Sequence, residues 1–203
     1  MDNLSNDQKF KIGSVVFIAG FLLVLIGRYW TADYLYQKGA IEAQQGLYES
    51  AVKNTQSAID LSPTEAIYHN QMARIFTNLA LGLSRNDATE AVQLVPYAIS
   101  ESDIAYNLSP RNINIIQTRI SMYLELAQFN PEYLQLAVNL IKDTVPLSPT
   151  DPKLELYLGK AYANMGQIKN AEFALEKALE LKPDYAEAKK DLEIVQKLQN
   201  TKK

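Results

Sequence analysis

The chain has 203 residues, of which 47% are hydrophobic, and its formal net charge at pH 7 is −3. It contains no cysteine, which excludes disulfides and thiolate metal sites. Residues 31–110 hold more than twice as many acids as bases, which argues against a nucleic-acid partner. Beyond an apolar N-terminal segment, about 170 residues remain, enough for one soluble domain.

The first predicted element is a transmembrane helix over residues 10–31, after a polar tail over residues 1–9. Ile12 to Gly27 carry no charge and are mostly Ile, Leu, Val and Phe. With the aromatic residues that follow and a snorkelling Arg28, the segment reaches about 20 residues, roughly the thickness of the hydrocarbon layer. We therefore expect a single-pass membrane protein with the lipid bilayer as a partner of residues 12–30.

This segment has two other interpretations. A cleaved signal peptide needs small residues before the cut, whereas Arg28, Tyr29 and Trp30 follow the run here. A buried helix of a soluble protein would carry the same apolar run and stays open as an alternative. Basic residues flank the run on both sides, and we expect the short N-terminus inside and the remaining chain on the extracytoplasmic side. No proline or glycine lies between Arg28 and Lys38, so the helix is expected to continue past the membrane.

Four segments after residue 31 end in related tripeptides. They are Leu61-Ser62-Pro63, Leu108-Ser109-Pro110, Leu147-Ser148-Pro149 and Leu181-Lys182-Pro183. Because proline cannot continue a helix, each tripeptide closes a helical unit. Repetition at roughly 34 residues or more is typical of a helical solenoid. The predicted fold is all-α, an α-solenoid over residues 32–183 of about four helical hairpins, at about 32–63, 64–110, 111–149 and 150–183.

The two outer units match at one constant offset. Adding 120 to the numbers of Gly39, Gly46, Ala51, Ala58 and Pro63 gives Gly159, Gly166, Ala171, Ala178 and Pro183. Gly159 is expected where two helices approach closely, and Gly46 and Gly166 where a helix ends. These residues resemble the tetratricopeptide repeat, best over residues 152–185. Residues 32–65 resemble it as well, although Glu42 occupies the usual aromatic position there. A generic bundle of helical hairpins is the alternative.

The two middle units are longer, with 47 residues from Pro63 to Pro110 and 39 from Pro110 to Pro149. Their extra residues must lengthen helices or loops. We expect one helix to end near residues 84–87, Asp87 to cap the next, and Pro96 to bend that helix. Asn130 with Pro131 predicts a further helix start.

Residues 184–203 are predicted to form a capping helix and tail. Apolar residues share one face of this segment, and lysines and glutamates lie elsewhere. The apolar set is Tyr185, Ala188, Leu192, Val195 and Leu198. Such a helix covers the last apolar surface of a solenoid.

The residues that support catalysis are scarce. His69 is the only histidine, and a packed histidine is its simplest interpretation. Without cysteine or a second histidine there is no metal constellation, and no glycine-rich phosphate loop is present. We therefore expect no enzyme, no catalytic residue, no cofactor and no metal. Gly13, Gly20 and Gly27 form a weak packing stripe on the apolar segment.

If the units stack in the usual way, their first helices line a concave groove. The predicted inward residues are Tyr36, Gln44, Asn70, Arg74, Asn78, Gln117, Glu125, Lys153, Lys160 and Asn164. A polar, amide-rich lining suits an extended peptide or a sugar chain better than an apolar helix. A solvated face without a ligand stays open. A clamp for chaperone tails is disfavoured, because Tyr36 and Ala40 stand where that subfamily has its lysine and asparagine.

The apolar segment and the repeats together are similar to the C-terminal tail of bacterial O-antigen ligase-like membrane proteins. The residues that carry this resemblance are Ala32 to Gly39, Phe129 to Leu134 and Pro149 to Leu154. The resemblance implies a non-catalytic accessory module beside envelope glycan machinery, since the glycan-transfer site of that family lies in a multi-span domain. The favoured hypothesis is a membrane-anchored scaffold that presents its groove to a peptide or protein partner. The accessory module of an O-antigen ligase or polymerase-like envelope glycan assembly protein is the alternative.

Overall fold

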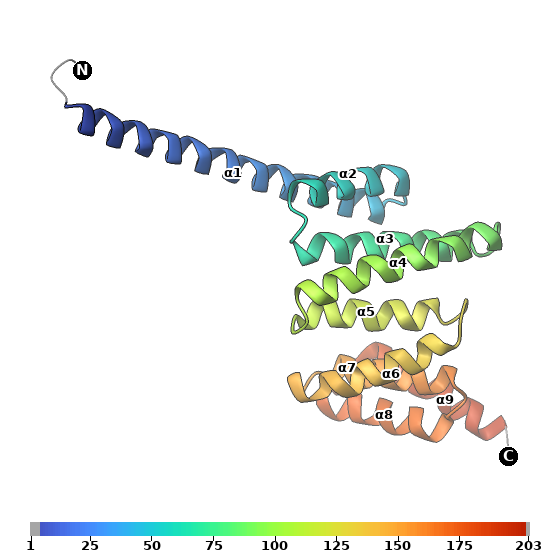
Figure 1. The fold of residues 1–203 in the computed structure, drawn as a ribbon. Helices are drawn as coiled ribbons and strands as arrows, with labels where there is room; N and C mark the ends of the chain where they lie inside the picture. The colour runs from blue at the N-terminus through green and yellow to red at the C-terminus, as the bar shows by residue number, and fades with distance from the viewer. Residues whose placement is uncertain (1–4, 202–203) are drawn as a thin grey trace. The chain divides into compact units, whose positions relative to one another are not determined.

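A computed structural model describes residues 5–201, and within that range the fold is all-α, as predicted, with no strand (Figure 1). The helices are α1 (Asn6–Gln44), α2 (Tyr48–Leu61), α3 (Ala66–Leu83), α4 (Ala88–Leu108), α5 (Ile113–Leu126), α6 (Glu132–Thr144), the short 3-10 helix η1 (Val145–Leu147), α7 (Pro152–Asn164), α8 (Ile168–Leu181) and α9 (Ala186–Thr201). The described residues form two compact units, 5–68 and 69–201, divided within α3.

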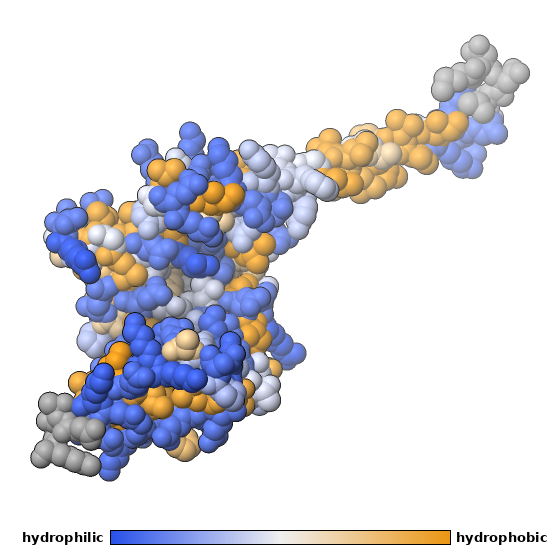
Figure 2. Space-filling model, turned by 180° about the vertical axis from the view of Figure 1, so that it is seen from behind, coloured by the Kyte–Doolittle hydropathy of each residue, from blue (hydrophilic) through white to orange (hydrophobic). Residues whose placement is uncertain are grey.

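The first unit is built on α1, which runs without a break for 39 residues. It begins at Asn6, four residues before the predicted start of the membrane helix, where the Ser5 side chain accepts from the Gln8 backbone N–H. An apolar stretch of α1 has a mean hydropathy of 2.3 and none of it is buried, so α1 has the length and composition of a membrane span. Figure 2 shows this stretch as a continuous apolar surface.

The C-terminal part of α1 forms a tight antiparallel hairpin with α2. A Cβ atom built on Gly39 would lie 2.5 Å from Thr55 Oγ1 and 3.1 Å from the Ala51 carbonyl oxygen, so only glycine fits there. The hairpin turn needs Gly46, whose φ is 77°. The helices therefore meet and end where the repeat pattern predicted.

Arg28 contacts the end of α2. Its predicted snorkelling into the headgroup layer stays a prediction, and the structure adds a partner for its guanidinium. Its Nη2 and Nε donate hydrogen bonds of 2.7 Å and 3.2 Å to the carbonyl oxygen of Leu61, the last residue of α2. The antiparallel return of α2 brings its unpaired terminal carbonyl groups next to Arg28.

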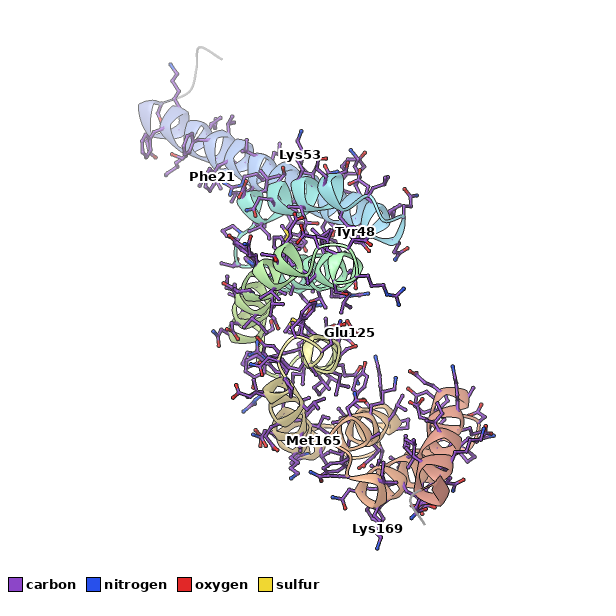
Figure 3. The ribbon with its side chains drawn as sticks, turned by 90° about the vertical axis from the view of Figure 1, so that its right-hand side faces the viewer. Phe21, Tyr48, Lys53, Glu125, Met165 and Lys169 are labelled. Carbon is purple, nitrogen blue, oxygen red and sulfur yellow. The ribbon has the colours of Figure 1, made fainter. Side chains whose placement is uncertain are left out.

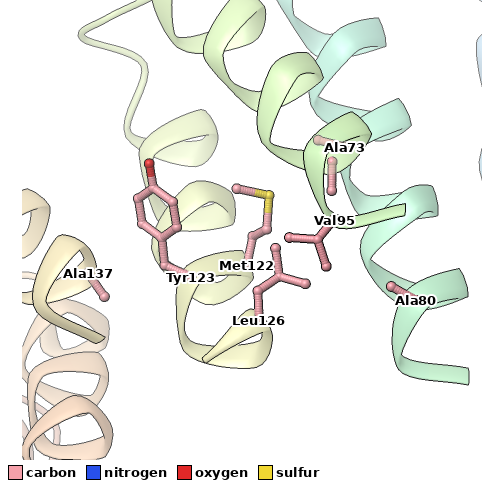
Figure 4. Packing of buried hydrophobic residues seen from close by; sticks show 8 residues of the cluster. Ala73, Ala80, Val95, Met122, Tyr123, Leu126 and Ala137 are labelled. Atoms are coloured by element: carbon pink, nitrogen blue, oxygen red, sulfur yellow. The ribbon is translucent and has the colours of Figure 1, made fainter. Parts of the chain in front are cut away.

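The second unit contains α3 from His69 onward with α4, then the pairs α5/α6 and α7/α8, followed by α9. One buried cluster joins α3, α4, α5 and α6 through Ala73, Val95, Met122, Leu126 and Ala137 (Figure 4). Small alanines against larger side chains let neighbouring helices approach closely without cavities. Stacking of successive hairpins therefore supplies the core.

The second repeat is long because its helices are long, whereas the third has helices of 14 and 13 residues and owes its extra length to the connection 127–131 and to η1. α3 and α4 have 18 and 21 residues, against 13 and 14 for α7 and α8. As predicted, the Asp87 side chain accepts from the Glu90 N–H, at 2.9 Å, and Asn130 Oδ1 accepts from the Glu132 N–H, at 3.0 Å. α4 continues through Pro96 to Leu108.

The last hairpin repeats the geometry of the first. A Cβ atom on Gly159 would lie 2.6 Å from Leu175 Cγ, and Gly166 has a φ of 72°. α9 then buries Ala188 and Val195 against α7 and α8. Leu198, however, is 45% exposed, so the predicted apolar face of α9 is only partly covered.

Candidate functional site

The predicted groove residues lie on the first helix of each hairpin. Tyr36 and Gln44 are on α1 in the first unit, and the other eight are on α3, α5 and α7 in the second. In the first unit Tyr36 packs on Tyr68, with ring centroids 5.1 Å apart. Burial, reinforced by Asp33, raises the pKa of Tyr68 to about 12. Tyr36 thus has a packing role, whereas Gln44 is exposed at the end of α1.

In the second unit four predicted residues meet in a cavity of about 220 Å³ between α3, α5 and α7. They are Arg74, Asn78, Glu125 and Lys153. The other lining residues are Thr77, Thr118, Ser121, Met122 and Tyr157. Hydroxyl, amide and charged groups therefore dominate this cavity, which we call the polar cavity.

Two cations and one carboxylate set the charge of the polar cavity. No ion pair among residues 5–201 includes Arg74 or Lys153, although the Lys153 Nζ lies 5.5 Å from the centre of the Tyr157 ring. Glu125 accepts a hydrogen bond of 2.8 Å from the Ser121 hydroxyl on the same helix. The cavity therefore offers excess positive charge and hydrogen-bond donors.

A larger cavity of about 400 Å³ adjoins the polar cavity and shares Ser121, Glu125 and Tyr157 with it. Leucine, isoleucine, valine and alanine side chains supply most of its remaining lining, and we call it the apolar cavity. They are Leu124, Ala163, Leu175, Ile194, Val195 and Leu198, with Gly159, Lys160, Asn164 and Asp191 also present. Figure 3 shows Glu125 on the inner side of the second unit and Lys169 on its outer edge.

The contribution of α9 to this site was not predicted from the sequence. Ile194 and Leu198 of α9 are 47% and 45% exposed where they line the apolar cavity. The apolar spacing along α9 could have indicated this second role, but it was interpreted only as a face that covers the core. α9 therefore both closes the core and forms one wall of the candidate site.

Lys160 is held by α9. Its ammonium is ion-paired with Glu187 and lies 3.8 Å from Asp191 Oδ2. Burial raises the pKa of the Asp191 carboxyl, and Lys160 opposes that shift. Lys160 thus balances two acids and is less available to a ligand than Lys153.

Two of the predicted amides serve to join helices. Gln117 is buried, and its Nε2 donates to the carboxylate of Asp151, the residue that caps α7. Asn70 Nδ2 donates to Thr118 Oγ1 at 3.4 Å, between α3 and α5. Gln117 and Asn70 line neither cavity.

The described side chains offer little for catalysis. His69 is buried, with Nδ1 2.7 Å from Glu101 Oε2, as expected for a packed histidine. Residues 5–201 hold no group of three His, Cys, Asp or Glu side chains that could bind a metal ion.

Comparisons with known proteins agree with this architecture. The family model for the tetratricopeptide repeat matches residues 158–185. The solved structure of PilF from Pseudomonas aeruginosa is similar, with a TM-score of 0.66 and 18% identity, over 86% of this chain and 72% of that one. TTC0263, a thermophilic tetratricopeptide-repeat protein of Thermus thermophilus, has a TM-score of 0.61 and 22% identity, over 81% and 80%.

A third similar structure is YrrB, described as a tetratricopeptide-repeat protein with an unusual peptide-binding site. Its TM-score is 0.55 and its identity 18%, over 77% of this chain and 72% of that one. No curated protein matches the chain, and the resemblance to O-antigen ligase-like tails stays a prediction. The chain is an all-helical repeat protein with the fold of a tetratricopeptide-repeat solenoid.

Proposed function

We propose that this protein is a membrane-anchored scaffold whose second unit binds an extended peptide segment of a protein partner. The observation that carries the proposal is the continuity of the polar and apolar cavities on the inner side of that unit. Asn78, Thr118 and Ser121 can pair with the backbone groups of an extended peptide. The apolar cavity can take a bulky side chain, which supplies affinity by burying apolar surface.

The charges of the polar cavity favour an acidic segment. Arg74 and Lys153 outnumber Glu125, and neither cation has an acidic partner among the described residues. A carboxylate placed between them would form charge-assisted hydrogen bonds. YrrB, whose described function is peptide binding on a similar fold, supports this proposal at the level of architecture.

Membrane anchoring rests on α1. Its apolar stretch is wholly exposed, and soluble proteins rarely leave such a large apolar surface uncovered. Insertion in a bilayer would cover it. We propose that the segment before the apolar stretch lies inside and the repeats outside, on the extracytoplasmic face. A single cysteine at Ser84, labelled with an impermeant reagent in intact cells, tests the topology, because the chain has no cysteine of its own.

Binding is tested with the full chain in nanodiscs and a library of fluorescent peptides, each with one bulky apolar residue and either acidic or neutral neighbours. We expect acidic members to bind, and an Arg74→Ala, Lys153→Ala double variant to lose at least about tenfold in affinity, about 1.4 kcal/mol. Lys169→Ala is the matched control, since Lys169 lies on the outer edge (Figure 3). Equal affinity of the double variant and the control would refute the proposed site.

A further inference from the structure

Arg28 lies at the boundary between the apolar stretch of α1 and the first hairpin. The uncharged run Ile12 to Gly27 ends immediately before it, and its guanidinium is bonded to the Leu61 carbonyl at the end of α2. A cation at a helix C-terminus is favoured by both the unpaired carbonyl groups and the helix dipole. The contact therefore fixes the C-terminal end of α2 at the same level as the end of the apolar run.

The length of the apolar run places this level relative to a bilayer. Its sixteen residues rise about 24 Å at about 1.5 Å per residue, less than the roughly 30 Å of a hydrocarbon core. Phe10 and Trp30 are 75% and 74% exposed and lie twenty residues apart, about 30 Å along the helix. Aromatic side chains favour the two interfaces of a membrane. Arg28, two residues before Trp30, then lies at the inner edge of one interface, about 3 Å deeper than Trp30.

We propose that the turn from Leu61 to Thr64 docks in the headgroup layer of the bilayer, held there by Arg28. This inference rests on the proposed membrane anchoring of α1. Pro63 and Thr64 are exposed at this turn, so both can contact the headgroups. The partner is a zwitterionic phospholipid surface, because Asp60 and Glu65 directly flank the turn in sequence and would repel an anionic one.

Docking has a structural consequence for the first hairpin. α1 leaves the membrane and α2 returns toward it, so the start of α2 lies about 20 Å from its end, at about 1.5 Å per residue. The Arg28 contact then joins the hairpin to the span at the membrane, in addition to the packing of Gly39 on Thr55 farther out. The orientation of the first repeat is thereby set by the span itself.

The test uses the full chain in phosphatidylcholine nanodiscs, with single spin labels at Thr64→Cys or Ser50→Cys. The chain has no native cysteine, and Trp30 is its only tryptophan. We expect the label at position 64 to show a severalfold higher ratio of oxygen to nickel-complex accessibility than the label at position 50. Arg28→Gln should bring the value at position 64 toward that at position 50. Lys38→Gln, which removes a positive charge farther along α1, should leave it unchanged.

Quenching of Trp30 by brominated lipids separates this inference from the anchoring on which it rests. If Trp30 is not quenched, the span is not inserted and the anchoring proposal fails. If Trp30 is quenched but the labels at Thr64 and Ser50 give equal ratios, anchoring stands and docking is overturned. If the label at Thr64 lies in the headgroup layer and Arg28→Gln does not move it, the role of Arg28 is overturned.

Discussion

Replacing Gly159 with alanine tests how closely α7 and α8 pack in the second unit. The new Cβ atom would lie 2.6 Å from Leu175 Cγ and 2.7 Å from its Cδ2. Carbon atoms in contact prefer about 3.5–4.0 Å, so one of the helices or Leu175 must move by about 1 Å. Leu175 is fully buried beside Leu156 and Ala178, so it can move only toward the apolar cavity that it also lines, at the expense of its packing in this cluster.

The magnitude follows from two opposing effects. Overpacking a core costs about 1–3 kcal/mol, and alanine gains about 1 kcal/mol over glycine in helix propensity. We therefore expect Gly159→Ala to destabilise the second unit by about 1 kcal/mol. Gly82→Ala is the matched control, because Gly82 also lies in a helix but has nothing within 4 Å of its Cβ position. This control should gain up to about 1 kcal/mol.

Thermal unfolding of the full chain in nanodiscs, followed by circular dichroism at 222 nm, measures both variants. At roughly 2–4 °C per kcal/mol, their Tm values should differ by about 2–8 °C, with Gly159→Ala below the wild type and Gly82→Ala at or above it. A Gly159→Ala protein as stable as the control would show that α7 and α8 are not in close contact at this position.

Three further substitutions test local features. Gly166→Ala should lower the Tm by the equivalent of about 1–2 kcal/mol, because φ is 72° there, and an unchanged Tm would contradict the left-handed turn. Thr55→Val should raise the free energy of unfolding by about 1 kcal/mol, seen as a higher urea midpoint. The reason is that the buried Thr55 hydroxyl has no hydrogen-bond partner among the described residues. Asp191→Asn should be more stable than the wild type at pH 7. Burial raises the folded-state pKa of Asp191, so its contribution is favourable below the unfolded pKa and is lost as pH rises through the folded pKa. The stability gap should therefore close on acidification, and a gap constant from pH 7 to pH 3 would count against this reasoning.

Local chemistry explains why much of the fold was predictable. Gly46 and Gly166 end helices because only glycine takes their φ cheaply, and Asp87 caps α4 through its own carboxylate. Such features depend on a few neighbouring residues, which the sequence displays directly. The constant offset between the outer units likewise located the close approach at Gly159 from the spacing of small residues alone.

The candidate site was predictable only in part, for a physical reason. Arg74 and Lys153 are 79 residues apart in sequence and meet in one cavity because α3 and α7 both flank α5. Stacking of first helices allowed that prediction. Gln117 was assigned to the same groove, but its amide bonds to Asp151 on the next repeat, and no local pattern reveals such a pairing.

The sequence by itself determined the helical repeat, the ends of most helices and the apolar segment of α1, because these depend on periodicity and on residues with special backbone preferences. Only the tertiary structure decided which side chains are free to bind. Arg28 became a cap for α2, and Leu198 of α9 became a wall of the apolar cavity. Each of these roles depends on the exact distance between helices far apart in the chain, which side-chain packing fixes and sequence spacing does not.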